Sequence, residues 1–169
     1  MSGSPIQLAV GALKLFLHSL PIGSKFNIVS FGSDFTKVFP QSVVYNEENL
    51  KIAVNQISKF DADMGGTEIL EPLIDLVSVK GNKDLPRCLY LLTDGAVSNT
   101  DEVVNLIRAN NQNCSVNTFG IGSGADESLI KNSAKAGRGH FTFIYQLHEI
   151  ETKVIEALTK DFYEYLTVK

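Results

Sequence analysis

The chain has 169 residues, of which 44% are hydrophobic and 20% charged, an ordinary composition for a globular protein. Its formal net charge of -4 disfavours nucleic acid and anionic membranes as partners, because both attract a basic face. No apolar run reaches the roughly 18 residues of a membrane-spanning helix, so we predict one domain over residues 1–169 without membrane association.

Helices and strands are predicted to alternate along the chain. From Pro5 to Leu20 apolar residues recur at three- and four-residue steps, which predicts a helix that Ser4 caps. Segment 25–31 alternates and predicts a strand, and short edge strands follow at 35–40 and 42–45. Further predicted helices cover 47–57, 68–79, 101–109, 126–136 and 147–166, and further predicted strands cover 87–93, 115–121 and 140–144.

This order predicts an α/β fold: a doubly wound, mainly parallel, Rossmann-like sheet with helices on both faces. Segment 87–93 is continuously apolar, as expected of a strand buried on both faces. The inward residues predicted for helices 68–79 and 147–166 are Ile69, Leu73, Ile74, Val77, Ile150, Val154, Ile155, Leu158 and Phe162.

Polar residues stand where ligands bind in such folds, beyond the carboxyl ends of the strands. Asp94 directly follows strand 87–93, Thr67 precedes a helix, and Ser2 and Ser4 precede the first helix. Three hydroxyls and one carboxylate suit Mg²⁺, which prefers oxygen ligands. Each motif alone is also explained by a turn or a helix cap, and the opening residues also resemble a cloning linker. The hypothesis therefore depends on their joint placement.

The motifs Ser2-Gly3-Ser4, Gly65-Gly66-Thr67-Glu68 and Thr93-Asp94-Gly95 resemble, in order and spacing, the metal-ion-dependent adhesion site of von Willebrand factor A domains. The stretch "FGIGSGADESLIKNSAKAGRGHFTFI" is similar to the same family between its fifth and sixth strands. The resemblance covers essentially the whole chain. It is strongest to the VIT-associated branch, the type of von Willebrand A domain-containing protein 5A and vault poly(ADP-ribose) polymerase.

The resemblance implies that Ser2, Ser4, Thr67 and Asp94 are metal ligands, directly or through water. The implied partner-binding rim consists of Gly65, Gly66, Glu68 and Gly95. The family pattern begins with a central strand ending in Asp, and that strand and Asp would fall before residue 1. We therefore expect the first central strand to be missing and Mg²⁺ (or Mn²⁺ or Ca²⁺) to bind weakly, since one carboxylate is lost.

The family's strand order places the missing strand between segments 25–31 and 87–93. Two outcomes are predicted: either these strands pair directly, or another segment, such as one from a second copy, occupies the position. The second outcome would appear as self-association.

The function implied by the resemblance is a non-catalytic protein-interaction module, in which Mg²⁺ accepts an acidic group of a protein partner. The alternative is a metal-independent structural or assembly domain with a degenerate site. An enzyme is disfavoured, because no nucleophile–base pair is apparent and glycines 120, 122 and 124 do not fit G-x-G-x-x-G. Cys88 and Cys114 are predicted to be buried thiols without a disulfide, which favours an intracellular, cytoplasmic location.

Overall fold

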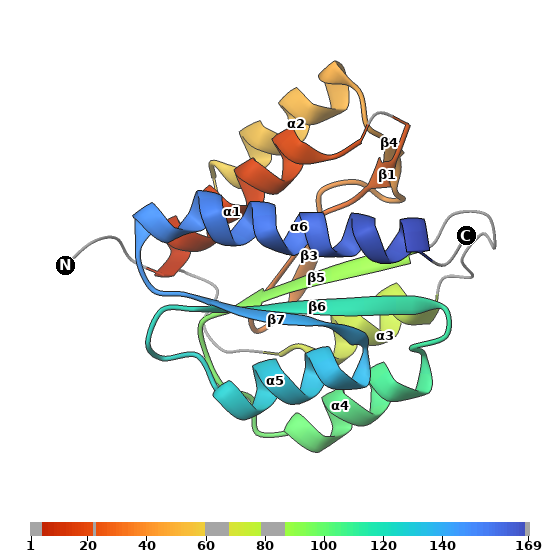
Figure 1. Ribbon diagram of the computed structural model, residues 1–169, viewed down its shortest axis with the longest axis vertical. Helices are drawn as coiled ribbons and strands as arrows, with labels where there is room; N and C mark the ends of the chain where they lie inside the picture. Colours follow the sequence, from red (N-terminus) through yellow and green to blue (C-terminus); the bar gives the residue numbers. More distant parts are fainter. Residues whose placement is uncertain (1–4, 22, 60–67, 79–86, 168–169) are drawn as a thin grey trace. The chain divides into compact units, whose positions relative to one another are not determined.

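The computed structural model describes residues 5–21, 23–59, 68–78 and 87–167, and of residues 160–167 only the helical backbone (Figure 1). The chain falls into two compact units. One comprises Met1–Val29, Lys37–Ala62 and Ile144–Lys169, and the other comprises Ser30–Thr36 and Asp63–Phe143. The single domain expected over residues 1–169 stays a prediction.

The second unit is built on a sheet with the strand order β5-β6-β7. These strands are β5 (Arg87–Thr93), β6 (Cys114–Ile121) and β7 (Arg138–Ile144). β5 and β6 are parallel and in unbroken register along all 7 residues of β5. β7 runs the same way, because Val116 of β6 donates to the Gly137 carbonyl beside the start of β7, while Phe143 near its end packs against Gly120. The predicted α/β class with a parallel sheet is confirmed.

Three helices pack against this sheet, and Figure 1 shows α4 and α5 side by side along one face. They are α3 (Leu70–Ser78), α4 (Thr100–Ala109) and α5 (Glu127–Ala136). Their shared core consists of Ile69, Leu73, Leu91, Val103, Val104, Ile107, Val116, Leu129 and Ala136. The inward positions predicted at Ile69 and Leu73 are confirmed. The inward position predicted for Ile74 was wrong, since Ile74 is 45% exposed. It follows the buried Leu73 by one residue, a rotation of about 100° around the helix axis, and therefore points away from the core.

The predicted strand 25–31 is interrupted at Asn27. The amide group of its side chain donates to the Phe39 carbonyl at 2.8 Å and accepts from the backbone N–H groups of Ile28 and Phe39 at 2.8 and 3.1 Å. A side chain thus replaces the ladder between the strands at this position. The resulting short strands are β1 (Lys25–Phe26), β2 (Val29–Phe31), β3 (Phe35–Lys37) and β4 (Val43–Val44), with β1 paired to β4 and β2 to β3.

Strands β2 and β5 belong to separate sheets in the described chain, so the direct pairing offered as one outcome above is not formed. The burial predicted for segment 87–93 was also wrong. In β5 only Leu91 and Thr93 are fully buried, whereas seven of the eight residues of β6 are. The difference follows from position, because β5 stands at the end of the described strand order and β6 at its centre.

The first unit contains the helices α1 (Pro5–Ser19), α2 (Glu47–Ile57) and α6 (Ile150–Thr167) and the short 3-10 helix η1 (Leu147–Glu149). Its core consists of Leu17, Phe26, Ile28, Phe39, Ala53 and Ile57. Asn46 caps α2, since its side chain accepts from the Asn49 N–H at 2.8 Å. In α6, Val154 is fully buried as predicted, but Ile155 is 46% exposed. The predicted cap Ser4 lies outside the described residues.

Gln146 and Glu149 form a capping box at the start of η1, which leads into α6. The Glu149 carboxylate accepts from the N–H groups of Tyr145 at 2.9 Å and Gln146 at 3.3 Å, and lies 3.6 Å from the Lys153 ammonium. The Tyr145 hydrogen bond, with smaller contributions from Gln146 and Lys153, lowers the pKa of Glu149. The ionised carboxylate is therefore the form that stabilises this corner.

Cys114 is buried, as predicted, whereas the burial predicted for Cys88 was wrong, since Cys88 is only half-buried in β5. Cys88 pairs in register with Ser115, so Cys88 and Cys114 point to opposite faces of the sheet. Burial raises the pKa of Cys114, which is 4% exposed. Among the helices that the structure describes, none is long and apolar enough to cross a bilayer.

Candidate metal-binding site

The site is built where β5 ends. Thr93, the last residue of β5, is 6% exposed, whereas the next residue, Asp94, is exposed to solvent. The Gly95 N–H lies 3.4 Å from the Thr93 hydroxyl oxygen, which tightens the turn that carries Asp94. The sequence therefore leads directly from the buried last residue of a strand to an exposed carboxylate, the arrangement expected of a ligand at a strand's carboxyl end.

The loop that follows the neighbouring strand β6 lies against this turn. The Asp126 N–H donates to the Gly95 carbonyl at 3.3 Å. A Cβ atom placed on Gly124 would stand 3.2 Å from the Asp94 carbonyl oxygen. Because β5 and β6 are parallel neighbours, their carboxyl ends meet at one edge of the sheet, and these contacts join the two loops there.

The same loop carries Gly122 and Gly124, and the hydrogen bonds of Asp126 disfavour phosphate binding there. Its carboxylate accepts from the N–H groups of Ser128 at 2.9 Å and Leu129 at 3.3 Å and so caps α5. These are N–H groups of the kind that would otherwise bind a phosphate at a helix N-terminus. A carboxylate at this position would also repel the anion.

Most of the predicted ligand set lies outside the described residues. This applies to the ligands Ser2, Ser4 and Thr67 and to the rim residues Gly65 and Gly66. Asp94 is thus the predicted ligand that the structure describes, and its hard carboxylate oxygen fits a magnesium ligand set. Within the described ranges, no group of three or more His, Cys, Asp or Glu residues could hold a metal ion.

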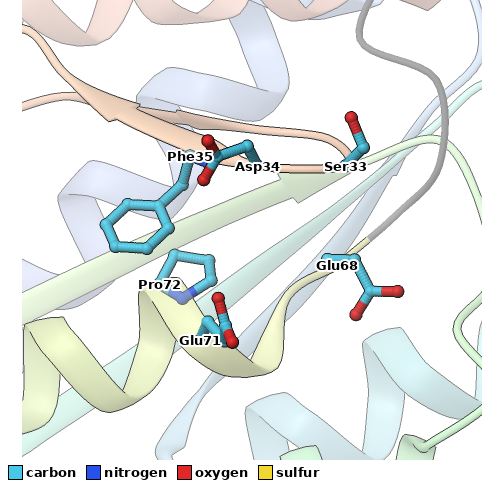
Figure 2. A pocket seen from close by; sticks show the side chains of 6 residues that line it. All are labelled: Ser33, Asp34, Phe35, Glu68, Glu71 and Pro72. Atoms are coloured by element: carbon cyan, nitrogen blue, oxygen red, sulfur yellow. The ribbon is translucent and has the colours of Figure 1, made fainter.

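The predicted rim residue Glu68 lines a pocket of about 250 Å³ in the second unit (Figure 2). The pocket is lined by Ser33, Asp34, Phe35, Glu68, Glu71 and Pro72. The Glu68 N–H donates to the Gly32 carbonyl at 2.9 Å, which ties the start of α3 to the turn between β2 and β3. Three carboxylates give this pocket a negative potential. The sequence pattern did not single it out, because Asp34 and Glu71 come from separate segments that only the fold brings together.

The comparison with family models decides the family. The model described as von Willebrand factor type A domain matches residues 1–143. The chain belongs to the von Willebrand factor type A domain family. A von Willebrand factor A domain-containing protein of Dictyostelium discoideum is 40% identical over 159 residues, covering 94% of this chain and 17% of the relative. Von Willebrand factor A domain-containing protein 5A of Rattus norvegicus is 40% identical over 153 residues, covering 90% of this chain and 19% of the relative.

Three solved structures share the fold. A von Willebrand factor type A protein from Catenulispora acidiphila matches with a TM-score of 0.76 at 20% identity, over 89% of this chain and 37% of that chain. Proximal thread matrix protein 1 from the mussel byssus, with a zinc-occupied MIDAS motif, matches with a TM-score of 0.65 at 20% identity. The match covers 88% of this chain and 40% of that chain. Manganese-loaded Plasmodium vivax TRAP protein matches with a TM-score of 0.63 at 14% identity. The match covers 88% of this chain and 65% of that chain. At these identities the likeness establishes the fold.

The predicted membership of the von Willebrand A family, and the likeness to protein 5A, are confirmed. This von Willebrand A domain spans less than a fifth of the length of the two curated relatives described above.

Proposed function

We propose that this von Willebrand A domain is a non-catalytic protein-interaction module whose metal site receives an acidic group of a protein partner. The observation that carries the proposal is the placement of Asp94, an exposed carboxylate at the carboxyl end of β5 beside the end of β6. Ser2, Ser4 and Thr67 would add hydroxyl oxygens, directly or through water. The zinc and manganese held by two solved neighbours support a metal in this family.

Mg²⁺, or Mn²⁺ or Ca²⁺ in its place, would supply a Lewis-acidic coordination position when bound. The protein's part is to hold the ion with few negative charges: one carboxylate and three hydroxyls leave an excess of positive charge. An acidic side chain of the partner would compensate that excess. The rim around it would be formed by Gly65, Gly66, Glu68 and Gly95. The same shortage of carboxylates predicts weak metal binding.

Calorimetric titration with Mg²⁺ and Mn²⁺ tests this proposal. We expect affinity weaker than micromolar in the unmodified domain and no measurable binding in Asp94→Asn. Asp101→Asn is the matched control, because Asp101 is also exposed but lies in the first turn of α4. Unchanged binding in Asp94→Asn would refute the site, and micromolar binding by the unmodified domain would refute the argument from ligand charge.

A second candidate is a metal-independent structural or assembly domain with a degenerate site. It is motivated by the predicted ligand set, in which Asp94 is the single carboxylate. Partner capture in EDTA and in Mg²⁺ separates the two proposals. Capture that needs Mg²⁺ favours the adhesion site, and capture that is unchanged by EDTA favours assembly.

The proposed setting is intracellular and cytoplasmic, which is supported by a sequence with two cysteines and no disulfide-scaffold pattern. A protein partner is proposed rather than nucleic acid or membrane, since the net charge is -4. We also propose that the strand position between β2 and β5 supports self-association, because these strands belong to separate sheets. Light scattering across a dilution series tests this: a mass that stays monomeric at high concentration contradicts it.

A further inference from the structure

The turn that carries Asp94 is held by a loop from the neighbouring strand through backbone atoms. The loop between β6 and α5 contacts both residues of the turn: Asp126 donates to the Gly95 carbonyl at 3.3 Å, and Gly124 packs against the Asp94 carbonyl oxygen. The Asp94 carboxylate itself takes no part in these contacts. The loop therefore holds the backbone of the turn and leaves the carboxylate available to a ligand.

Space, rather than backbone conformation, accounts for glycine at position 124. A Cβ atom there would stand 3.2 Å from the Asp94 oxygen, closer than ordinary van der Waals contact, while the φ angle of Gly124 is one that other residues adopt. Gly122 in the same loop differs, because its φ of 75° favours glycine for conformational reasons. Gly124→Ala thus moves the contact to Asp94 without straining its own backbone.

Asp126 connects the Asp94 turn to the first turn of α5. Its carboxylate caps α5 through the N–H groups of Ser128 and Leu129, while its backbone N–H holds Gly95. Leu129 and Ile130, which follow in α5, are both fully buried in the core. A displacement of the Asp94 turn therefore has to be accommodated either at the two loop contacts or at the start of α5.

From these contacts we infer that Gly124 and Asp126 are positioning residues for Asp94, and that metal binding at Asp94 is coupled to the order of the first turn of α5. The inference rests on the proposed function, in which Asp94 is a metal ligand. Coupling of this kind is reciprocal: a bound ion that orders the Asp94 turn protects the Asp126 N–H, and loosening that N–H weakens binding of the ion.

The experiment is a Mg²⁺ titration followed by amide chemical shifts, together with hydrogen exchange with and without Mg²⁺. The variants are Gly124→Ala, Asp126→Ala and, as control, Ser123→Ala, which changes an exposed residue of the same loop. Gly124→Ala displaces the Asp94 carbonyl, and Asp126→Ala keeps the backbone N–H but loosens the first turn of α5 that holds it. We expect both test variants to bind Mg²⁺ at least about 5-fold more weakly, the lower end of typical coupling between sites, and Ser123→Ala to match the unmodified domain. Mg²⁺ should slow exchange at Asp126 but not at Gly137, whose N–H donates to the Ser133 carbonyl at the far end of α5.

The outcomes separate this inference from the proposed function. If Mg²⁺ binds but neither variant weakens it and Asp126 exchange is unchanged, the inference is overturned while the proposed function stands. If Mg²⁺ does not bind, the proposed function fails and the coupling to metal fails with it. In that case, shifted Asp94 and Gly95 amide resonances in metal-free Gly124→Ala would still support positioning, and unshifted ones would overturn it. If Gly124→Ala does not fold, Asp126→Ala decides the same question.

Discussion

Asn117 bridges all three strands of the β5-β6-β7 sheet, and Asn117→Ala should destabilise the domain strongly. The side chain lies in β6, where the residue is 2% exposed. Its Nδ2 donates to the Cys88 sulfur in β5 at 3.1 Å, and its Oδ1 accepts from the His140 N–H in β7 at 2.7 Å. Truncation to alanine removes both bonds and deprives the His140 N–H of this acceptor.

The size of the effect follows from the two bonds. Loss of the acceptor of the partly buried His140 N–H costs about 1–3 kcal/mol, and the weaker bond to sulfur adds a fraction of that. A loss of about 2–3 kcal/mol corresponds to roughly a 30- to 150-fold change in the folding equilibrium. With a urea slope of about 2 kcal/mol per molar, typical of a domain of this kind, the unfolding midpoint should fall by about 1–1.5 M.

Urea unfolding followed by circular dichroism measures this loss. Asn105→Ala is the control, because Asn105 is exposed and accepts one hydrogen bond from Arg108 at 3.0 Å on the surface of α4. Its cost should stay below about 0.5 kcal/mol. If Asn117→Ala cost no more than the control, with an unchanged slope, the reasoning that this side chain ties the strands together would be refuted.

Three further predictions concern other buried or charged groups. The Ser133 hydroxyl is buried and makes no hydrogen bond within the described structure, so Ser133→Ala should be neutral or stabilising by up to about 1 kcal/mol in thermal unfolding. Thr118→Val, in contrast, should cost about 1–2 kcal/mol, since the Thr118 hydroxyl donates to a backbone carbonyl of α5 at 2.7 Å; equal effects would contradict this distinction. Because the pKa of Glu149 is lowered from 4.5, its ionised form contributes stability above that pH, and the contribution is lost as the pH falls through the lowered pKa. Glu149→Gln should therefore flatten the acid limb of a plot of melting temperature against pH, and an unchanged acid limb would count against the capping role. Burial raises the pKa of Cys114, so a thiol reagent should label it more slowly than the half-buried Cys88 in the native protein and at a similar rate in urea; faster native labelling of Cys114 would contradict the buried position.

Local patterns predicted most of the elements because the signals that begin and end them are local. α2 begins after Asn46 and α5 after Asp126, and in both cases the side chain of the cap makes the hydrogen bonds expected of it. The predicted helix 68–79 appears as Leu70–Ser78, and the predicted strand 115–121 as Cys114–Ile121. Differences of one or two residues at the ends are what fraying and the definition of helix boundaries produce.

The errors arose where a distant part of the chain decides the local structure. The alternating pattern of 25–31 predicts one strand, but Asn27 exchanges hydrogen bonds with Phe39, twelve residues away. Ile155 fits the apolar spacing of α6, yet it is 46% exposed, because periodicity gives the apolar side of a helix but not the width that is covered. Neither the contact of Asn27 with Phe39 nor the exposure of Ile155 can be predicted from the local segment alone.

The glycines after β6 show most clearly why the candidate site could be predicted only in part. Asp94 could be identified because a carboxylate directly after an apolar strand has a defined place in an α/β sheet. The glycines at 120, 122 and 124 look alike in sequence, and their pattern invites a phosphate-binding interpretation. In the structure, a different physical reason favours glycine at each position. A Cβ at Gly120 would overlap the Phe143 ring, Gly122 has a φ of 75°, and Gly124 leaves room for the Asp94 carbonyl. The third reason links the loop to Asp94, and it depends on two loops being neighbours, which only the parallel pairing of β5 and β6 brings about.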